Sequence, residues 1–187
     1  MKKIEAMTFL IQALAVDDVA VFCNGITARE GYMIKDRPRN FYMLASMGHA
    51  MMIGLGIAQA SPHRVVVFDG DGNFLMNPGG AAMVGTQSPE NLVHLVFDNG
   101  VYETTGNQVS ISKDLDLVAM AAGMNYKSSQ RVGDLDALKK AQDIILSQPG
   151  PHFLVVDVYR GQPDASRVIP MSPQEMAERF RNHMLNQ

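Results

Sequence analysis

Short apolar runs alternate along the chain with stretches in which apolar residues recur every three or four positions. The runs predict buried strands, and the recurring positions predict helices that each turn one face to a sheet. Strands are expected at 19–22, 41–44, 65–68, 92–97, 127–132 and 153–158. Helices are expected at 4–15, 27–32, 48–60, 78–85, 115–123, 135–145 and behind Ser172. This alternation indicates an α/β fold with a mostly parallel sheet flanked by helices.

Residues at the ends of these elements refine the picture. Thr27 is expected to cap the second helix, and residues 172–175 form a capping-box pattern with proline at the first helical position. The polar segment 100–112 is expected to be a loop, and 161–170 a connector. Four apolar residues form one stripe of the first helix: Ile4, Met7, Ile11 and Leu14.

Composition narrows the class of protein. The 187 residues suit a single domain spanning 1–187, with 47% apolar and 19% charged residues. A net charge of −3 gives no basic surface for nucleic acid. Cys23 is the one cysteine in the sequence, so no intramolecular disulfide can form. No apolar run is long enough to span a bilayer and no targeting segment is recognisable, so we expect a cytoplasmic protein without a membrane partner.

Three expected strand ends carry candidate chemistry, because ligands of parallel α/β sheets bind beyond the carboxyl ends of strands. Gly70-Asp71-Gly72 follows one strand, and Asn99 follows the next after residues 73–98. The glycines let backbone N–H groups approach an anion, and the next helix can point its amino end at a phosphate. Asp71 and Asn99 supply oxygen ligands suited to Mg²⁺. The alternative is that Gly-Asp-Gly is simply a turn.

Gly-Asp-Gly, a spacer and Asn together resemble the motif of thiamine diphosphate enzymes. Residues 46–58 and 98–108, and the loop 24–30, resemble the phosphonopyruvate and sulfopyruvate decarboxylases. The resemblance extends over 19–158 and implies a diphosphate-binding (PP) domain that holds thiamine diphosphate and Mg²⁺.

The resemblance also assigns residues. It implies metal ligation by Asp71, Asn99 and the backbone carbonyl of Val101, and it places Met47 beneath the cofactor as the wedge that enforces its bent shape. The implied cofactor-binding residues are Gly25, Ile26, Thr27, Ala45, Ser46, Met47, Gly70, Asp71, Gly72, Asn73, Asn99, Val101, Tyr102 and Thr104.

Several further residues receive interpretations. His49, beside Met47, is a candidate for relaying a proton or contacting the acidic tail of a substrate, and hence for a catalytic role. Arg29 is the first candidate for binding that tail through its guanidinium group. Residues 54–56, Gly-Leu-Gly, are interpreted as close helix packing rather than a dinucleotide motif. The other histidines are expected at the surface or at strand ends: His63, His94, His152 and His183.

One part of the expected machinery has no counterpart in the sequence. In the resembled enzymes a glutamate of a pyrimidine-binding (PYR) domain activates the cofactor, and neither Glu5 nor Glu30 lies in the expected context. We therefore expect the PYR domain on a separate α-type chain, in a hetero-oligomer that resembles two-subunit sulfopyruvate decarboxylase.

The implied activity is that of a carbon–carbon lyase acting on a small anionic 2-oxoacid. The preferred reaction converts 3-sulfopyruvate to sulfoacetaldehyde and CO₂. Decarboxylation of phosphonopyruvate is the first alternative. Carboligation of the acetolactate synthase type and a non-catalytic binding subunit are the others.

Overall fold

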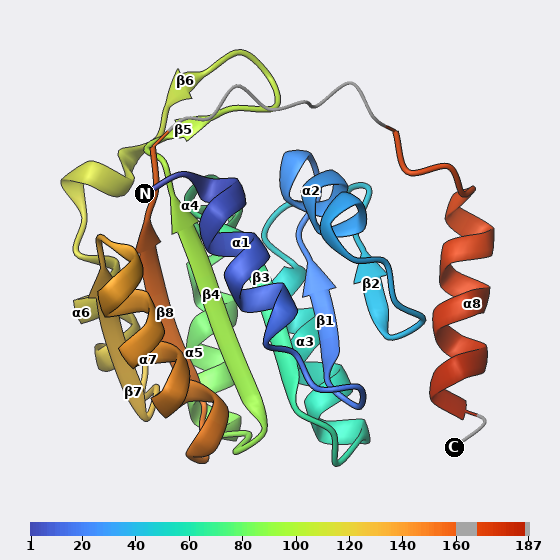
Figure 1. Ribbon diagram of the computed structural model, residues 1–187. Coiled ribbons are helices and arrows are strands. Elements are labelled where there is room, and N and C mark those ends of the chain that lie inside the picture. Colours follow the sequence, from blue (N-terminus) through green and yellow to red (C-terminus); the bar gives the residue numbers. More distant parts are fainter. Residues whose placement is uncertain (160–167, 186–187) are drawn as a thin grey trace.

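The core of the fold is a six-stranded parallel sheet, seen in a computed structural model that describes residues 1–159 and 168–185 (Figure 1). The strand order is β2-β1-β3-β4-β8-β7, and every neighbouring pair is parallel. The strands are β1 Val19–Phe22, β2 Asn40–Tyr42, β3 Val65–Gly70, β4 Leu92–Asp98, β7 Ser128–Val132 and β8 His152–Asp157. The predicted fold class is confirmed.

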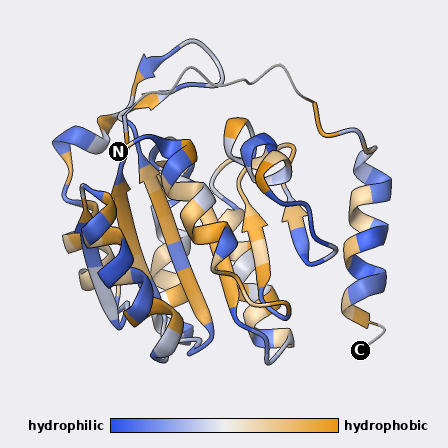
Figure 2. Cartoon of the chain, in the orientation of Figure 1, coloured by the Kyte–Doolittle hydropathy of each residue, from blue (hydrophilic) through white to orange (hydrophobic). Residues whose placement is uncertain are grey.

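Helices cover both faces of this sheet, which explains why its central strands are mostly apolar (Figures 1 and 2). All residues of β1 and β4 are buried. One face packs against α1 Lys3–Gln12, α2 Ile26–Ile34 and α7 Leu135–Ser147. The other packs against α3 Ala50–Ala60, α4 Asp71–Leu75, α5 Pro78–Gln87 and α6 Leu117–Gly123. The last helix, α8 Pro173–Leu185, lies beside β2 at the edge of the sheet.

The segments that follow β1 and β3 leave the sheet on opposite faces. The chain leaves β1 through α2 on one face and leaves β3 through α4 on the other. The carboxyl ends of β1 and β3 are hydrogen-bonded neighbours, so the two departing segments open a crevice between them. A crevice at such a switch point is the usual ligand site of this architecture.

Several expected details are corrected. Gly25, not Thr27, occupies the N-cap of α2, since the helix already begins at Ile26. Segment 100–112 is not simply a loop, because it holds the hairpin β5 Val101–Tyr102 with β6 Gln108–Val109 and the start of a 3-10 helix, Ile111–Asp114. Ile4 is 39% exposed and lies off the buried stripe of α1.

Other expectations are confirmed. The Ser172 hydroxyl accepts from the Glu175 N–H at 3.2 Å, and the Glu175 carboxylate accepts from the Ser172 N–H at 2.7 Å, which completes the capping box of α8. The expected connector 161–170 lies mostly outside the described residues. Within the described ranges, no helix combines the length and apolar character needed to cross a bilayer.

Candidate functional site

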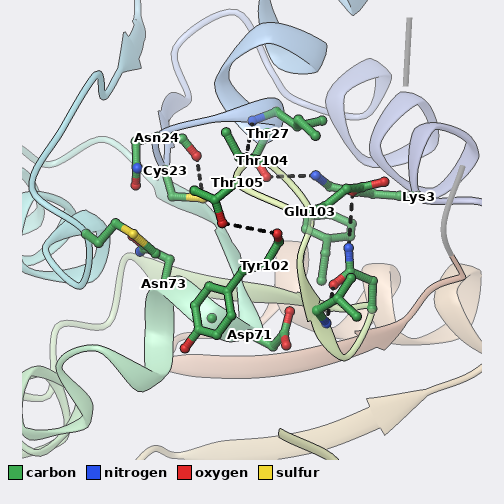
Figure 3. Close-up of a pocket in the computed structure, with 17 residues that line it drawn as sticks. Lys3, Cys23, Asn24, Thr27, Asp71, Asn73, Tyr102, Glu103, Thr104 and Thr105 are labelled. Carbon is green, nitrogen blue, oxygen red and sulfur yellow. Dashed lines mark hydrogen bonds between the residues drawn. The ribbon is translucent and has the colours of Figure 1, made fainter. Parts of the chain in front are cut away.

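A cavity of about 120 Å³ opens at the carboxyl edge of the sheet, in the crevice beside β1, β3 and β4 (Figure 3). It brings together three segments that are far apart in the sequence: 23–27, 70–73 and 97–105. Its lining residues are Lys3, Cys23, Asn24, Ile26, Thr27, Met47, Gly70, Asp71, Gly72, Asn73, Phe97, Asn99, Val101, Tyr102, Glu103, Thr104 and Thr105.

Asp71 is the buried acid of this cavity. It begins α4 directly after β3 and is 2% exposed. Burial raises the pKa of the Asp71 carboxyl, as does the nearby Asp98 carboxylate, while the Ser110 and Ser112 hydroxyls act in the opposite direction. Among the described residues, none donates a hydrogen bond to its Oδ2 atom. A buried carboxylate oxygen without a partner is costly, and a cation would stabilise it.

Asn99 and Val101 lie on the neighbouring strand end. Asn99 Oδ1 accepts a hydrogen bond from the Val101 N–H at 3.0 Å, and Asn99 Nδ2 donates to the Glu103 carboxylate at 3.2 Å. The amide orientation is therefore fixed by the turn after β4. Together with Asp71, this region offers carboxylate, amide and backbone oxygens, the donor set of a hard cation such as Mg²⁺.

Among the oxygens offered by Asp71, Asn99 and Val101, only the Asp71 carboxylate is ionisable. In the part of the chain that the structure describes, no group of three or more His, Cys, Asp or Glu residues could hold a metal ion. Asn99 and Val101 would contribute neutral oxygens, beside the one carboxylate of Asp71.

The amino end of α2 forms the opposite wall. This nine-residue helix has no side-chain cap, and its Ile26 N–H is held by Thr104 Oγ1 at 3.4 Å. Gly25 has a φ of +83°, and a Cβ there would lie 2.5 Å from Thr104 Oγ1, so glycine is required at this position. Unsatisfied N–H groups at the start of a helix attract an anion. Asn24 Oδ1, also in this wall, is buried with no hydrogen-bond partner among the described residues.

The helix that was expected after Gly72 is α4, which already begins at Asp71, and it contributes less than expected from the sequence. It is only five residues long, so its dipole gives little support to an anion. The Tyr102 ring packs against Gly72, where a Cβ would lie 2.5 Å from a ring carbon. Tyr102 thereby lies beside Asp71 at the cavity (Figure 3).

Met47 lies at the cavity in a tightly turned loop before α3. Ser46 and Gly48, on either side of it, have φ values of +61° and +86°. The structure places Ala45 and Ser46 elsewhere, in a second cavity of about 230 Å³ between β2 and α8.

The candidates for substrate binding do not reach the main cavity. His49 is exposed, and its Nδ1 atom lies 3.1 Å from the Met47 carbonyl oxygen. Arg29 is half-buried on α2 and does not line the cavity. Their substrate roles stay predictions. The predicted cofactor-binding residues all line the cavity except Gly25, Ala45 and Ser46.

Sequence reasoning missed several lining residues, above all Lys3. Its Nζ atom donates to Thr27 Oγ1 at 2.9 Å and pairs with Glu30 at 3.0 Å. Lys3, Met7 and Leu10 are buried on the same face of α1. A predicted helical stripe that began at Lys3 instead of Ile4 would have placed Lys3 on the buried face. Glu103 was placed on the loop after the predicted metal ligands but was assigned no contact, although it lines the cavity.

The fold and the cavity define an α/β protein with a cation and anion site at the switch point of its sheet, and comparison with known proteins agrees with this class. Residues 23–156 match the family described as thiamine pyrophosphate enzyme, C-terminal TPP binding domain, and the chain belongs to this family. Benzoylformate decarboxylase from Polynucleobacter necessarius superposes with a TM-score of 0.68 at 25% identity, covering 85% of this chain and 33% of that one.

Two curated relatives bring the comparison closer. The sulfopyruvate decarboxylase subunit beta of Methanothermobacter thermautotrophicus is 41% identical over 96% of this chain and 94% of its own length. The phosphonopyruvate decarboxylase of Streptomyces viridochromogenes is 40% identical over 96% of this chain. The chain spans only 45% of the length of that enzyme.

Proposed function

We propose that this chain is the metal- and diphosphate-binding subunit of a thiamine diphosphate-dependent decarboxylase of an acidic 2-oxoacid. The observation that carries the proposal is the geometry of the cavity. Asp71, with an unpartnered buried oxygen, lies with Asn99 and Val101 in a crevice that faces the uncapped amino end of α2. An oxygen-ligated cation beside an anion site suits a metal diphosphate.

Each wall then has a task. The Asp71 carboxylate, Asn99 Oδ1 and the Val101 carbonyl would hold Mg²⁺, while N–H groups at Ile26 and around Asn73 would hold the diphosphate. Met47 would support the bent cofactor from beneath. Thiamine diphosphate supplies the electron sink for loss of CO₂, and the protein supplies binding and orientation.

The chain is further proposed to act as a single PP domain, completed by an α-type partner whose PYR domain carries the activating glutamate. Its support is the match over 94% of a relative named as a beta subunit, against 45% of the phosphonopyruvate enzyme. The open flank beside Met47, where Ala45, Ser46 and His49 are exposed, is where we place this partner.

The preferred substrate is 3-sulfopyruvate, which would yield sulfoacetaldehyde and CO₂. Phosphonopyruvate is the second candidate, since a phosphonopyruvate decarboxylase is 40% identical to this chain. A carboxylate and a second anionic group are common to both substrates, so His49 and Arg29 remain the proposed contacts for the acidic tail.

Removing the proposed metal ligand tests the function. The chain is co-expressed with the product of the adjacent reading frame and assayed for CO₂ release with Mg²⁺ and thiamine diphosphate. Asp71→Asn is expected to lower kcat by about a hundredfold or more, as loss of a metal-orienting group does. Asp143→Asn is the control, because Asp143 is an exposed residue of α7.

The same assay decides among the alternatives. Turnover of sulfopyruvate above phosphonopyruvate and pyruvate supports the preferred substrate, and the reverse order supports the second candidate. A product with a longer carbon skeleton would identify a carboligase. Full activity of Asp71→Asn would contradict the catalytic proposal, and strong activity of the chain alone would contradict the need for a partner.

A further inference from the structure

Behind the Gly-Asp-Gly turn lies a chain of buried polar side chains that the proposed chemistry does not use. Asp69 on β3 and His94 on β4 are both 0% exposed, although His94 was expected at the surface or at a strand end. His94 Nε2 lies 3.0 Å from Asp69 Oδ2, and Nδ1 lies 3.1 Å from the Tyr126 hydroxyl. Because a carboxylate only accepts hydrogen bonds, we assign the Nε2 proton to the bond with Asp69. In the neutral ring, Nδ1 then accepts from Tyr126.

The phenol suits this donor role. Burial raises the pKa of Tyr126, and the Asp69 carboxylate raises it further, so its hydroxyl keeps its proton. Phe153 packs edge-on against both rings, with centroids 5.2 Å from His94 and 5.3 Å from Tyr126. The Tyr126 end of this hydrogen-bonded series is therefore fixed within the core of the domain.

Asp69 continues this series of hydrogen bonds toward the cavity. Its Oδ1 atom accepts from Asn73 Nδ2 at 2.5 Å and from the Gly70 N–H at 2.8 Å. Asn73 Oδ1 in turn accepts from the Gly48 N–H at 2.9 Å. Successive hydrogen bonds thus lead from the core to the backbone beside Met47, which lies on a separate loop.

The turn at Met47 needs such support. Ser46 and Gly48 both have positive φ values, and Ser46 adopts this conformation at a cost because it is not glycine. Asn73 holds the Gly48 N–H, and Asn77 Nδ2 donates to the Gly48 carbonyl at 3.1 Å. The loop is therefore clamped onto the segment that begins at Asp71.

We propose that Asp69 and Asn73 are positioning residues that hold the Met47 turn and Asp71 at one fixed separation. The bend imposed on the cofactor and the anchoring of its diphosphate are then set by one rigid unit. This inference rests on the proposed function for the roles of Met47 and Asp71, but the link between the two loops can be measured without any enzymatic activity.

Amide hydrogen exchange on the chain tests the link. Asn73→Ala removes the acceptor of the Gly48 N–H, and exchange there is expected to accelerate about tenfold, as for the loss of one hydrogen bond. Asn91→Ala is the matched control, because Asn91 donates to carbonyls at the opposite edge of the sheet. It should lower thermal stability without changing exchange at Gly48. Unchanged exchange in Asn73→Ala, or equal acceleration in both variants, overturns the proposal.

Two substitutions at Asp69 separate the effect of its hydrogen bond to Asn73 from the effect of its side-chain size. Asp69→Asn keeps an oxygen for Asn73, and its amide N–H faces His94 Nε2, which accepts once the ring carries its proton on Nδ1 and donates to the Tyr126 hydroxyl. Asp69→Leu keeps only the size. Exchange at Gly48 is expected to rise in the leucine variant and to stay within about twofold of wild type in the asparagine variant, because only the leucine variant loses the hydrogen bond. The same exchange rate in both variants removes Asp69 from the proposed unit.

A binding measurement connects the unit to the site. Asn73→Ala should lower kcat of the co-expressed complex about tenfold. The dissociation constant for inorganic pyrophosphate with Mg²⁺, measured by calorimetry on the chain, should change less than about threefold, since Asp71, Asn99 and the backbone N–H at position 73 remain. A parallel loss of pyrophosphate affinity would make Asn73 a plain diphosphate contact and overturn its positioning role. Failure of the wild-type chain to bind pyrophosphate would instead contradict the proposed function, and the exchange results do not depend on it.

Discussion

Lys3 is a single residue that connects two helices to the cavity. It is 8% exposed on α1, yet both of its polar partners, Thr27 and Glu30, lie on α2. A buried ammonium group is tolerated only when such partners replace water. Lys3 therefore fixes the amino end of α2, where the diphosphate is proposed to bind.

Removing the Lys3 charge should destabilise the domain. Lys3→Met keeps the apolar stem but leaves the Glu30 carboxylate, whose side chain is 13% exposed, without its cation. We expect a loss of about 3 kcal/mol in the free energy of unfolding. Chemical denaturation measures it. The double variant Lys3→Met/Glu30→Gln should recover at least half of the loss, because no buried charge is left unpaired. Lys2→Met, at an exposed position, is the control, and an equal loss there would contradict this account.

Single residues were also where sequence reasoning was weakest. Asp71 and Asn99 could be found because their spacing forms a motif, which the primary sequence preserves. Lys3 and His94 belong to no motif. Their burial depends on partners such as Thr27 and Asp69 that lie 24 and 25 residues away in sequence, and only the folded sheet brings these pairs together.

At the scale of elements, α3 shows two glycines with opposite surroundings. A Cβ on Gly54 would lie 2.4 Å from Val67 Cγ2, so the helix packs closely on β3 there, as the sequence predicts. Gly56 is exposed and has no atom within 4 Å of such a Cβ. The same residue type therefore serves packing at one position and has no packing role at the other.

This contrast gives a matched pair of substitutions. Gly54→Ala should destabilise the protein by about 1–3 kcal/mol through overpacking against Val67. Gly56→Ala should stabilise it by roughly 0.5–1 kcal/mol, because alanine favours a helix interior and meets no neighbour. Thermal and chemical denaturation check both values. Stabilisation of both variants would show that helix propensity alone decides the effect on stability.

Element types were predicted well and their ends less well. The buried strands could be predicted because both faces of the sheet are covered, which leaves uninterrupted apolar runs such as Val65–Phe68 within β3. The hairpin of Val101 with Val109 could not, since strands of two residues carry no periodicity. Thr27 was assigned as a cap from residue type, whereas the positive φ of Gly25 sets the start of α2.

At the scale of the whole molecule, α8 is an appended helix held mainly at one edge. Phe180 packs on Phe41 with ring centroids 5.3 Å apart, and Arg179 forms an ion pair with Asp36 at 2.6 Å. Partial burial would raise the pKa of Asp36, but hydrogen bonds from Arg179 and Tyr42 outweigh it and lower the pKa. The pair thus tethers α8 while Asp36 is ionised.

The tether should fail in acid. Because the folded-state pKa of Asp36 is lowered, its stabilising effect is present above the unfolded pKa of about 3.9 and is lost as the pH falls through the folded value. Hydrogen exchange of α8 amides should accelerate over that window. Arg179→Met should remove the Asp36-linked part of this dependence, whereas Arg181→Met, exposed two residues on, should leave it unchanged. Equal behaviour of the two variants would assign the acid response to other groups.

The packing of Tyr102 against Gly72 has an optical consequence. The sequence contains no tryptophan and five tyrosines, one of which lies at the cavity itself. Light at wavelengths that only tryptophan absorbs does not excite this chain. In an assembled complex such emission would belong entirely to the partner, while the phenol emission of this chain comes from five rings, of which Tyr102 lies in the crevice. The part of the phenol emission that Tyr102→Phe removes would therefore report on the cavity, separately from any indole emission.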